Sequence, residues 1–262
     1  MTRAVNVASS TSLALVTPAL GTPTSGVATN LTGLPLTTGV TGTLPEANGG
    51  TGTTVGYCGF KNRIINGSMV IDQRNAGASV TQTAANIYSL DRWQSYGSQA
   101  SKMTLQQSST APVGFANSIL VTSSSAYSVL SSDIFMLRQH IEGFNLADFG
   151  WGTSAAVTAT LSFWVRSSLT GTFGGAFYSS GGTLTYPFNF TISAANTWEQ
   201  KTITVAGPTT GGATLGNTSA AQVIFGLGAG ASNSATAGTW AASGAYTATG
   251  STSVVGTSGA TW

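Results

Sequence analysis

A strict alternation of apolar and polar residues between Val157 and Val165 restricts the fold of this chain more than any other feature. Every second residue of this run is apolar, and the positions between carry Thr, Ser and Trp. Successive side chains of a β-strand point to opposite faces, so the pattern predicts a strand with one buried face. A second run, Tyr186 to Ile192, alternates in the same way, and Pro187 within it indicates an edge strand or a strand start.

Further short runs, separated by Gly, Ser, Asn and Pro, fill the chain from residue 61 onward. They predict eight more strands, at residues 64–71, 89–96, 103–107, 118–122, 135–141, 171–178, 198–205 and 222–227. The run 135–141 is ambiguous between strand and helix, and no longer window keeps a helical stripe. Residues 228–261 are mostly Ala, Gly, Ser and Thr and are expected to form loops or weak edge strands. The whole pattern predicts an all-β fold of two packed antiparallel sheets.

Charge is scarce and unevenly distributed. Charged residues make up 6% of the chain, against about 25% in an ordinary soluble domain. Residues 1–60 hold only Arg3 and Glu46, and no charge follows Lys201. So little charge favours an oligomer with a small exposed area. The formal net charge of +2 gives neither nucleic acid nor an anionic membrane an electrostatic attraction, so neither is expected as a partner.

Residues 18–60 are rich in Gly, Thr and Pro and contain a loose repeat, in which Leu34-Pro35 recurs as Leu44-Pro45. Proline fixes φ and removes a backbone donor, so neither a long helix nor a wide sheet is expected here. Glycine does not occupy every third position, which excludes collagen. A single chain cannot bury the Leu and Val side chains of this segment. The segment is therefore expected to be a thin shaft intertwined with copies of itself, with a flexible linker as the alternative.

Cys58 and His140 are the only cysteine and histidine of the chain. One thiol allows no intrachain disulfide. One cysteine and one histidine cannot supply the several ligands of a transition-metal site, so neither a transition metal nor another cofactor is expected. A structural calcium ion held by carboxylate and carbonyl oxygens of loops stays an alternative, although no dense Asp/Asn loop is present. No apolar stretch approaches the roughly 20 residues of a membrane span, so membrane insertion is not expected.

Several stretches of this sequence resemble phage tail fibre and related virion structural proteins. Residues 44–53 (LPEANGGTGT) resemble the linker between fibre shaft and head, and residues 61–74 (KNRIINGSMVIDQR) resemble the opening strand of a terminal jelly-roll domain. Residues 88–93 (YSLDRW), residues 161–167 (LSFWVRS) and Trp198 with residues 203–205 (ITV) add to the match. The resemblance covers nearly the whole chain. It implies a homotrimer, a fibrous stalk and a distal domain similar to carbohydrate-binding modules.

The predicted organisation has three parts. Residues 1–17 form a virion attachment segment, in which Met1 to Ser12 contact other tail or capsid proteins, residues 18–60 form the trimeric shaft and linker, and residues 61–262 form an antiparallel jelly-roll sandwich. Similar sequences continue beyond the position of Trp262 with a strand that closes the sandwich. The β domain is therefore expected either to be truncated at its C-terminus or to be closed by another copy, since an unpaired sheet edge is unfavourable.

The resemblance predicts a virion fibre protein on the tail or capsid surface that adheres to host surface polysaccharide through the distal sandwich. A sugar ring presents an apolar face and a polar rim, so its site needs exposed aromatic rings beside amides and hydroxyls. The candidates are aromatic residues beside Gly- or Ser-rich turns, namely Trp151, Tyr178, Tyr186 and Trp240. Burial in the core is the competing interpretation for each. Three other tryptophans are assigned to packing, namely Trp93, Trp164 and Trp198.

A structural head fibre, decoration or connector protein without receptor binding is the alternative function. A glycan depolymerase is less expected, because its chemistry needs a pair of carboxyl groups with distinct roles. Asp72 and Asp91 lie close in sequence to Arg74 and Arg92, which predicts ion pairs instead. His140 lies within a predicted strand and is expected to be structural. The chain is therefore expected not to be an enzyme.

Overall fold

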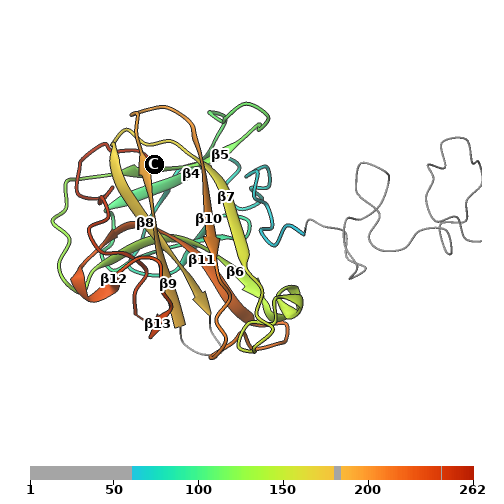
Figure 1. The fold of residues 1–262 in the computed structure, drawn as a ribbon. Helices are drawn as coiled ribbons and strands as arrows, with labels where there is room; N and C mark the ends of the chain where they lie inside the picture. Colours follow the sequence, from blue (N-terminus) through green and yellow to red (C-terminus); the bar gives the residue numbers. More distant parts are fainter. Residues whose placement is uncertain (1–60, 180–183, 243) are drawn as a thin grey trace, which may run out of the picture. The chain divides into compact units, whose positions relative to one another are not determined.

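Antiparallel β-strands make up most of the regular structure in the part of the chain that the structure describes. The computed structural model describes residues 61–179, 184–242 and 244–262 (Figure 1). The predicted attachment segment, the predicted shaft and Cys58 lie outside these residues. The chain divides into two units, Met1–Lys61 and Asn62–Trp262, and the second unit is called the β domain.

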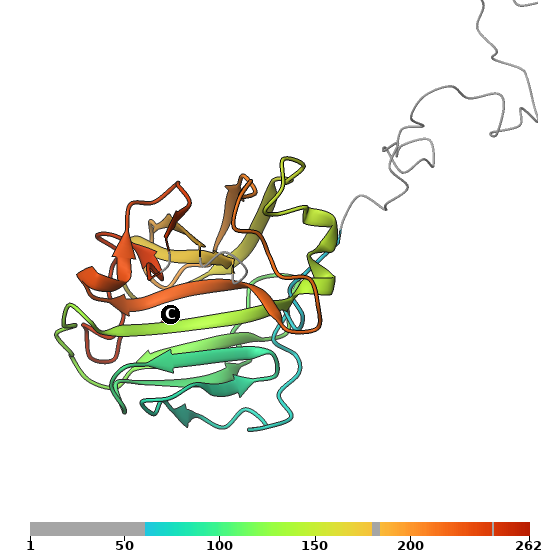
Figure 2. The ribbon, with the colours of Figure 1, turned by 90° about the horizontal axis from the view of Figure 1, so that it is seen from below.

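The larger layer of the β domain is a seven-stranded antiparallel sheet with the strand order β13-β9-β8-β11-β6-β3-β2. Its strands are β2 (Ile87–Leu90), β3 (Trp93–Gly97), β6 (Ile134–Glu142), β8 (Gly171–Ser179), β9 (Leu184–Ile192), β11 (Ser219–Ala229) and β13 (Ala241–Ala242). The central strand, β11, pairs with β6 on one side and with β8 on the other. Figure 2 shows β11 in orange beside β6 in green.

Smaller sheets form the opposite layer. An antiparallel sheet combines β1 (Val80–Thr81), β4 (Met103–Ser108) and β5 (Ser118–Ser123), and a second one pairs β7 (Ala159–Val165) with β10 (Glu199–Val205). A short parallel pair, β12 (Ser234–Ala235) with β14 (Thr247–Ala248), lies instead on the outer side of the seven-stranded sheet, where Thr247 is next to Gly174 and Gly226. The remaining regular structure described is three 3₁₀ turns, η3 (Gly143–Asn145), η4 (Ala147–Phe149) and η5 (Ala231–Asn233). The predicted all-β character is confirmed for the described residues, and their sheets are antiparallel apart from the β12–β14 pair.

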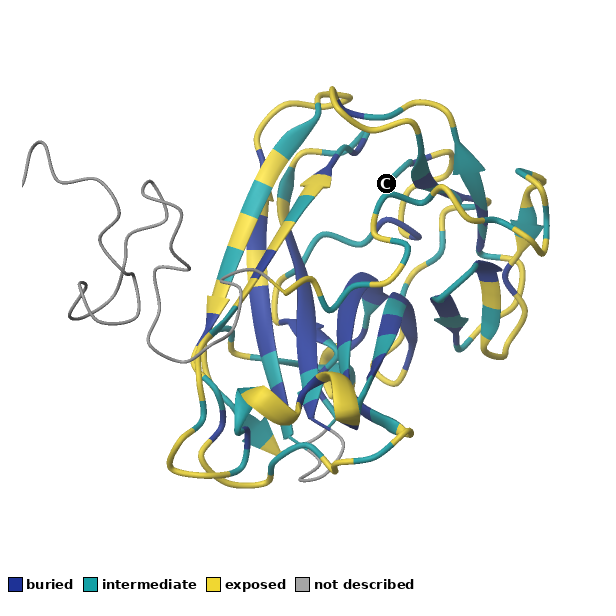
Figure 3. Cartoon of the chain, turned by 90° about the vertical axis from the view of Figure 1, so that its right-hand side faces the viewer, coloured by how far each residue is buried: buried dark blue, intermediate teal, exposed yellow. Residues whose placement is uncertain are grey.

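The inner faces of the two layers meet in one apolar core. Phe135 and Leu137 of β6 and Phe225 of β11 belong to the same buried cluster as Leu105 of β4 and Val121 of β5. The rings of Phe163 on β7 and Phe225 lie 5.0 Å apart in an edge-to-face contact. Figure 3 shows the buried residues concentrated on the central strands, while the connecting loops are largely exposed.

Eight of the ten predicted strands are confirmed with small shifts at their ends. The alternation of β7 is as predicted, since Leu161 and Val165 are buried and Ser162 is exposed. The ambiguous run 135–141 is a strand. The predicted strand 89–96 is wrong as a single element, because Arg92 has a positive φ of 73° and turns the chain between β2 and β3.

The predicted strand 64–71 is wrong. This segment turns instead, with φ values of 55° at Asn66 and 56° at Met69, a region that strands do not occupy. The Asn66 side chain holds the turn, because its amide accepts a hydrogen bond from the Ile71 N–H at 3.0 Å and donates one to the Ile71 carbonyl at 2.8 Å. No helix among the described residues has the length and apolar character needed to span a bilayer.

An apolar groove of about 640 Å³ opens beside β7, β5 and residues 62–71. Its lining includes Phe163, Phe225 and Trp262. The main chain of Trp262 pairs with Val121 of β5 in both directions, at 2.8 and 3.0 Å, while the buried indole N–H of Trp262 has no hydrogen-bond partner. The closing strand expected after Trp262 stays a prediction.

Candidate binding site

The outer face of the seven-stranded sheet carries a cluster of polar and aromatic side chains centred on Arg138, which we call the Arg138 face. Strand register brings it together, because Gln94 of β3 lies opposite Arg138 of β6, and Gln222 of β11 lies opposite both His140 of β6 and Tyr178 of β8. Its members are Asn86, Tyr88, Gln94, Tyr96, Arg138, His140, Tyr178, Gln222 and Tyr246.

Three neutral amides hold the guanidinium of Arg138. Its Nε donates to the Gln94 Oε1 at 2.8 Å, one terminal nitrogen donates to the Gln222 Oε1 at 3.2 Å, and the other donates to the Asn86 Oδ1 at 2.9 Å. The side chain is half-buried, and burial lowers the pKa of Arg138. An arginine remains charged at neutral pH even so, because its ordinary pKa is above 12. The face therefore holds a fixed positive charge.

His140 is neutral and its tautomer is set by its neighbours. The Gln94 Oε1 lies 3.1 Å from the His140 Nε2 and already accepts from Arg138, so the Nε2 carries the proton. The Nδ1 then accepts from the Ser219 hydroxyl at 2.8 Å. Burial lowers the pKa of His140 to about 4, with the positive charges of Arg138 and Arg92 contributing and Glu142 opposing.

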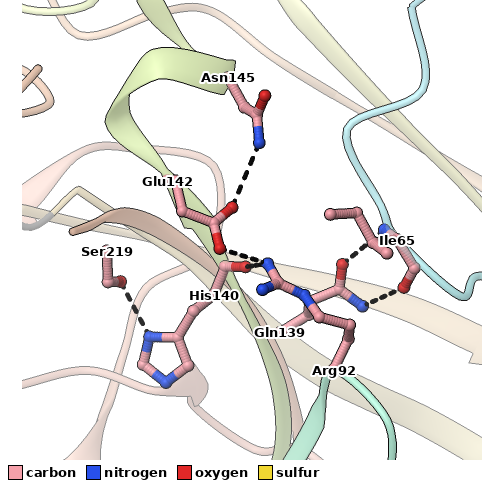
Figure 4. Close-up of polar contacts among 7 residues, drawn as sticks. All are labelled: Ile65, Arg92, Gln139, His140, Glu142, Asn145 and Ser219. Atoms are coloured by element: carbon pink, nitrogen blue, oxygen red, sulfur yellow. Dashed lines mark hydrogen bonds and ion pairs between the residues drawn. The ribbon is translucent and has the colours of Figure 1, made fainter. Parts of the chain in front are cut away.

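An ion pair lies beside this histidine at the end of β6 (Figure 4). Arg92 donates to the Glu142 carboxylate at 2.6 Å and to the His140 main-chain carbonyl at 3.1 Å. Asn145 of η3 donates to the second oxygen of Glu142 at 3.2 Å. Burial alone would raise the pKa of Glu142, but hydrogen bonds led by that from Arg92 lower it. Both oxygens of this carboxylate therefore already have partners.

Tyrosines provide the aromatic part of the Arg138 face. Tyr96, Tyr178 and Tyr246 pack against a small apolar cluster on the outer side of the sheet, formed by Ile134, Met136 and Ile224. Tyr88 is 41% exposed, and the Arg74 guanidinium lies 5.3 Å from the centre of its ring. Flat rings beside amide groups are the combination that sugar recognition requires.

The structure separates the four aromatic residues predicted to bind sugar. Tyr178 lies on the Arg138 face, whereas the other three form one aromatic cluster elsewhere. In that cluster the rings of Trp151 and Trp240 are 5.4 Å apart and edge-to-face, and those of Tyr186 and Trp240 are 5.5 Å apart and tilted. Trp151 is buried and donates its indole N–H to the Val157 carbonyl at 3.0 Å. The half-buried Trp240 donates to the Ala206 carbonyl at 2.7 Å.

The three tryptophans assigned to packing behave differently from one another. Trp93 is buried, and its indole N–H donates to the Asn66 carbonyl at 3.0 Å, which confirms the prediction for this residue. The prediction is wrong for Trp164, which is 39% exposed because it occupies an outward position of β7. Trp198 is half-buried and lines the apolar groove.

The predicted ion pairs of Asp72 and Asp91 are wrong. Asp72 accepts from the main-chain N–H groups of Asn75 and Gly77, so it closes a turn. Asp91 accepts from the Gln73 N–H at 2.7 Å. The two arginines have other partners: Arg74 lies over Tyr88 and Arg92 pairs with Glu142. Main-chain amides are nearer to these carboxylates than the neighbouring arginines because the segment turns.

Sequence reasoning missed most of the Arg138 face, including Arg138, Gln94, Gln222 and Tyr96. The candidates were aromatic residues beside turns, whereas the residues of the Arg138 face lie within strands. The alternation of residues 135–141 contained a usable signal, because it places Arg138 and His140 on the face opposite Phe135 and Leu137. Among the described residues, no three His, Cys, Asp or Glu side chains cluster in a way that could hold a metal ion.

Comparisons with known proteins place few constraints on this chain. No protein-family model and no curated protein match it. Among solved structures, it is similar to the enzymatically active domain of tailspike protein 4 of bacteriophage CBA120, with a TM-score of 0.36 and 14% sequence identity. The match covers 63% of this chain and 19% of that one. At this TM-score the likeness does not establish a shared fold.

Proposed function

We propose that this chain is a phage virion fibre protein whose β domain adheres to a host surface glycan through the Arg138 face. The observation that carries this proposal is the combination of half-buried tyrosines and fixed amide groups on one regular sheet face. The resemblance of residues 44–53 and 61–74 to virion fibre proteins supports the virion location, and the two layers of antiparallel strands support the jelly-roll assignment.

The Arg138 face suits a sugar better than the apolar groove does. A pyranose ring needs an aromatic surface for its apolar side and hydrogen-bonding groups for its hydroxyls. The Arg138 face offers both, since Tyr178 and Tyr96 lie beside Gln222 and Gln94. The groove also brings aromatic rings and amides together, as with Trp164, Trp198 and Gln200, but its one charged lining residue, Arg166, already donates to the Asn196 carbonyl.

Assembly into a homotrimer would compensate for weak binding at each site. An open sheet face buries less of a ligand than an enclosed pocket does, so weak single-site affinity is expected. Three copies on one fibre convert later contacts into intramolecular events, which raises the overall affinity without new contacts. The proposal includes attachment to other virion proteins through Met1 to Ser12, and it assigns binding without catalysis.

A glycan array with the purified full-length chain tests this function. Adhesion to at least one bacterial surface polysaccharide is expected, and Tyr178→Ala and Tyr96→Ala should each reduce it about tenfold, because stacked aromatic contacts are lost. Trp164→Ala is the matched control, since it removes an exposed aromatic ring from β7 in the opposite layer. Equal binding by all four proteins, or no adhesion to any polysaccharide, would refute the proposal.

A further inference from the structure

Two N–H groups of the Arg138 guanidinium have no partner among the three amides that hold this side chain in place. A guanidinium carries five N–H groups, and Gln94, Gln222 and Asn86 each accept one of them. One N–H on each terminal nitrogen remains. Two N–H groups on the terminal nitrogens of an arginine match the two oxygens of a carboxylate, which is the bidentate geometry that arginine forms most strongly.

The charge of Arg138 is not neutralised by the described residues around it. All three of its hydrogen-bond acceptors are uncharged amides. The nearest acidic side chain described on this strand, Glu142, is already bound to Arg92 and Asn145. Half-buried charges in proteins are usually paired, because an unpaired charge loses its hydration without compensation. The amides hold the guanidinium in place, but they carry no negative charge that would neutralise it.

The remaining groups of the face add positive charge or none. His140 is neutral in the arrangement described above, and the Arg92–Glu142 pair has no net charge. Arg74 lies over the ring of Tyr88 at 5.3 Å and places a second cation at the margin of the face. Tyr96 and Tyr246 contribute aromatic rings and no carboxylate. A ligand that rests on these rings would therefore meet a net positive surface.

We propose that the glycan bound at the Arg138 face carries a carboxylate, as in hexuronic or sialic acid residues, and that Arg138 pairs with that carboxylate. This inference rests on the proposed function, because it names the class of sugar for the same face. The tyrosines contact the ring whatever its charge, while Arg138 discriminates acidic from neutral sugars. A sulfate or phosphate ester can also accept from two N–H groups of an arginine, so a sulfated polymer is included in the test to separate the two kinds of anion.

The test compares acidic polysaccharides with their carboxyl-reduced forms, which keep every other group. The full-length protein is titrated with polygalacturonate, alginate, hyaluronan and polysialic acid, each beside its reduced form, and with a sulfated and a neutral polysaccharide. At least one acidic polymer should bind about tenfold or more tightly than its reduced form, since the reduced form loses the charge-assisted pair with Arg138. Free glucuronate should compete for this binding, and free glucose should not.

Variants assign the preference to Arg138. Arg138→Gln should remove the difference between the acidic and reduced forms, and Arg138→Lys should retain part of it. Tyr178→Ala should weaken both forms equally. Circular dichroism and thermal midpoints establish that each variant is folded, and the glucuronate competition needs no variant.

Equal binding of acidic and reduced forms, stronger binding of the sulfated polymer, or binding of neutral glycans alone overturns the carboxylate inference while the proposed function stands. Failure to bind any glycan overturns both.

Discussion

The side-chain amide of Gln139 pairs with the main chain of Ile65 in both directions. The Ile65 N–H donates to the Gln139 Oε1 at 2.7 Å, and the Gln139 Nε2 donates to the Ile65 carbonyl at 2.9 Å (Figure 4). Gln139 is fully buried on the inner face of β6. Its amide therefore takes the place of a neighbouring strand for a segment that forms no strand of its own.

Replacing Gln139 with Leu should destabilise the β domain. The change keeps a similar volume but leaves the N–H and carbonyl of Ile65 without partners, which costs about 1–3 kcal/mol when such groups are buried. Urea denaturation of the full-length protein measures the free energy of unfolding. Gln200→Leu is the control, because Gln200 is exposed on β10 and should change the stability by less than about 0.5 kcal/mol. An equal effect of the two substitutions would contradict the assigned role.

Asp133 is a buried carboxylate held only by uncharged donors. It accepts hydrogen bonds from the Tyr127 hydroxyl at 2.7 Å, the Leu130 N–H at 2.9 Å and the Ser98 hydroxyl at 2.8 Å. Asp133→Asn places a donor amide against these donors, so a loss of about 1.5–3 kcal/mol is expected in the free energy of unfolding. Tyr127→Phe removes one of these bonds and should cost less. Wild-type stability in Asp133→Asn would show that the network does not depend on charge.

The same carboxylate should make the domain sensitive to acid. Burial alone would raise the pKa of Asp133, but its hydrogen bonds outweigh that effect and lower the pKa to about 2. A lowered pKa means that the stabilisation is complete above the unfolded value of about 4 and is lost as the pH falls toward 2. Thermal midpoints of the wild type and Asp133→Asn should therefore converge between pH 4 and pH 2. A constant difference over that range would contradict the assignment.

His140 should also lower the stability of the domain as the pH falls, in a pH range above that of Asp133. Its pKa is lowered to about 4 in the folded domain, against about 6.5 in an unfolded chain. Between these values the unfolded chain binds a proton that the folded one does not, so stability falls as the pH decreases from 6.5 to 4. Because the chain contains no other histidine, His140→Gln should flatten the pH dependence of the urea midpoint between pH 6.5 and 5. An unchanged slope would show that His140 is not its source.

The Arg92–Glu142 pair should contribute little to stability. The two side chains are 34% and 27% exposed, and pairs with such exposure are worth about 1 kcal/mol or less. A double-mutant cycle with Arg92→Gln and Glu142→Gln measures the coupling by urea denaturation. The coupling should decrease in 0.5 M NaCl because salt screens exposed charges. A coupling above about 2 kcal/mol would contradict this prediction, because it would mean that the pair is shielded from solvent.

The strands of the core were predictable from sequence because burial of one face of each strand produces the alternation of apolar and polar residues. In β6 and β7, each apolar residue of the alternation meets the opposite layer, as Phe163 meets Phe225. The segment 64–71 looked similar, but Ile65, Val70 and Ile71 are each more than 40% exposed. Its turn depends on Asn66 contacting Ile71 and on Gln139, which is 74 residues away from Ile65. A local pattern does not contain such a distant partner.

The binding site was less predictable than the fold for a related reason. Tyr178 was a candidate because of its neighbouring Gly and Ser residues, yet its place on the Arg138 face follows from its register with Gln222. Trp151 and Trp240 stand beside similar turns but donate their indole N–H groups to main-chain carbonyls of the domain. Which strand lies beside which is decided by pairing between distant segments, and the chemistry of the Arg138 face depends on that order.

The central position of β11 in the large sheet has a consequence for how the domain forms. The strands β2, β3 and β6 make one block and β8 with β9 make another, and only β11 joins them. A ribosome must therefore synthesise residues 219–229 before the two blocks can unite. Until then β6 and β8 both expose the strand edges that β11 pairs in the finished sheet, and exposed strand edges are the condition under which β proteins associate wrongly. Refolding should accordingly be slow, and substitutions within β11 should retard it more than substitutions at β2 or β13.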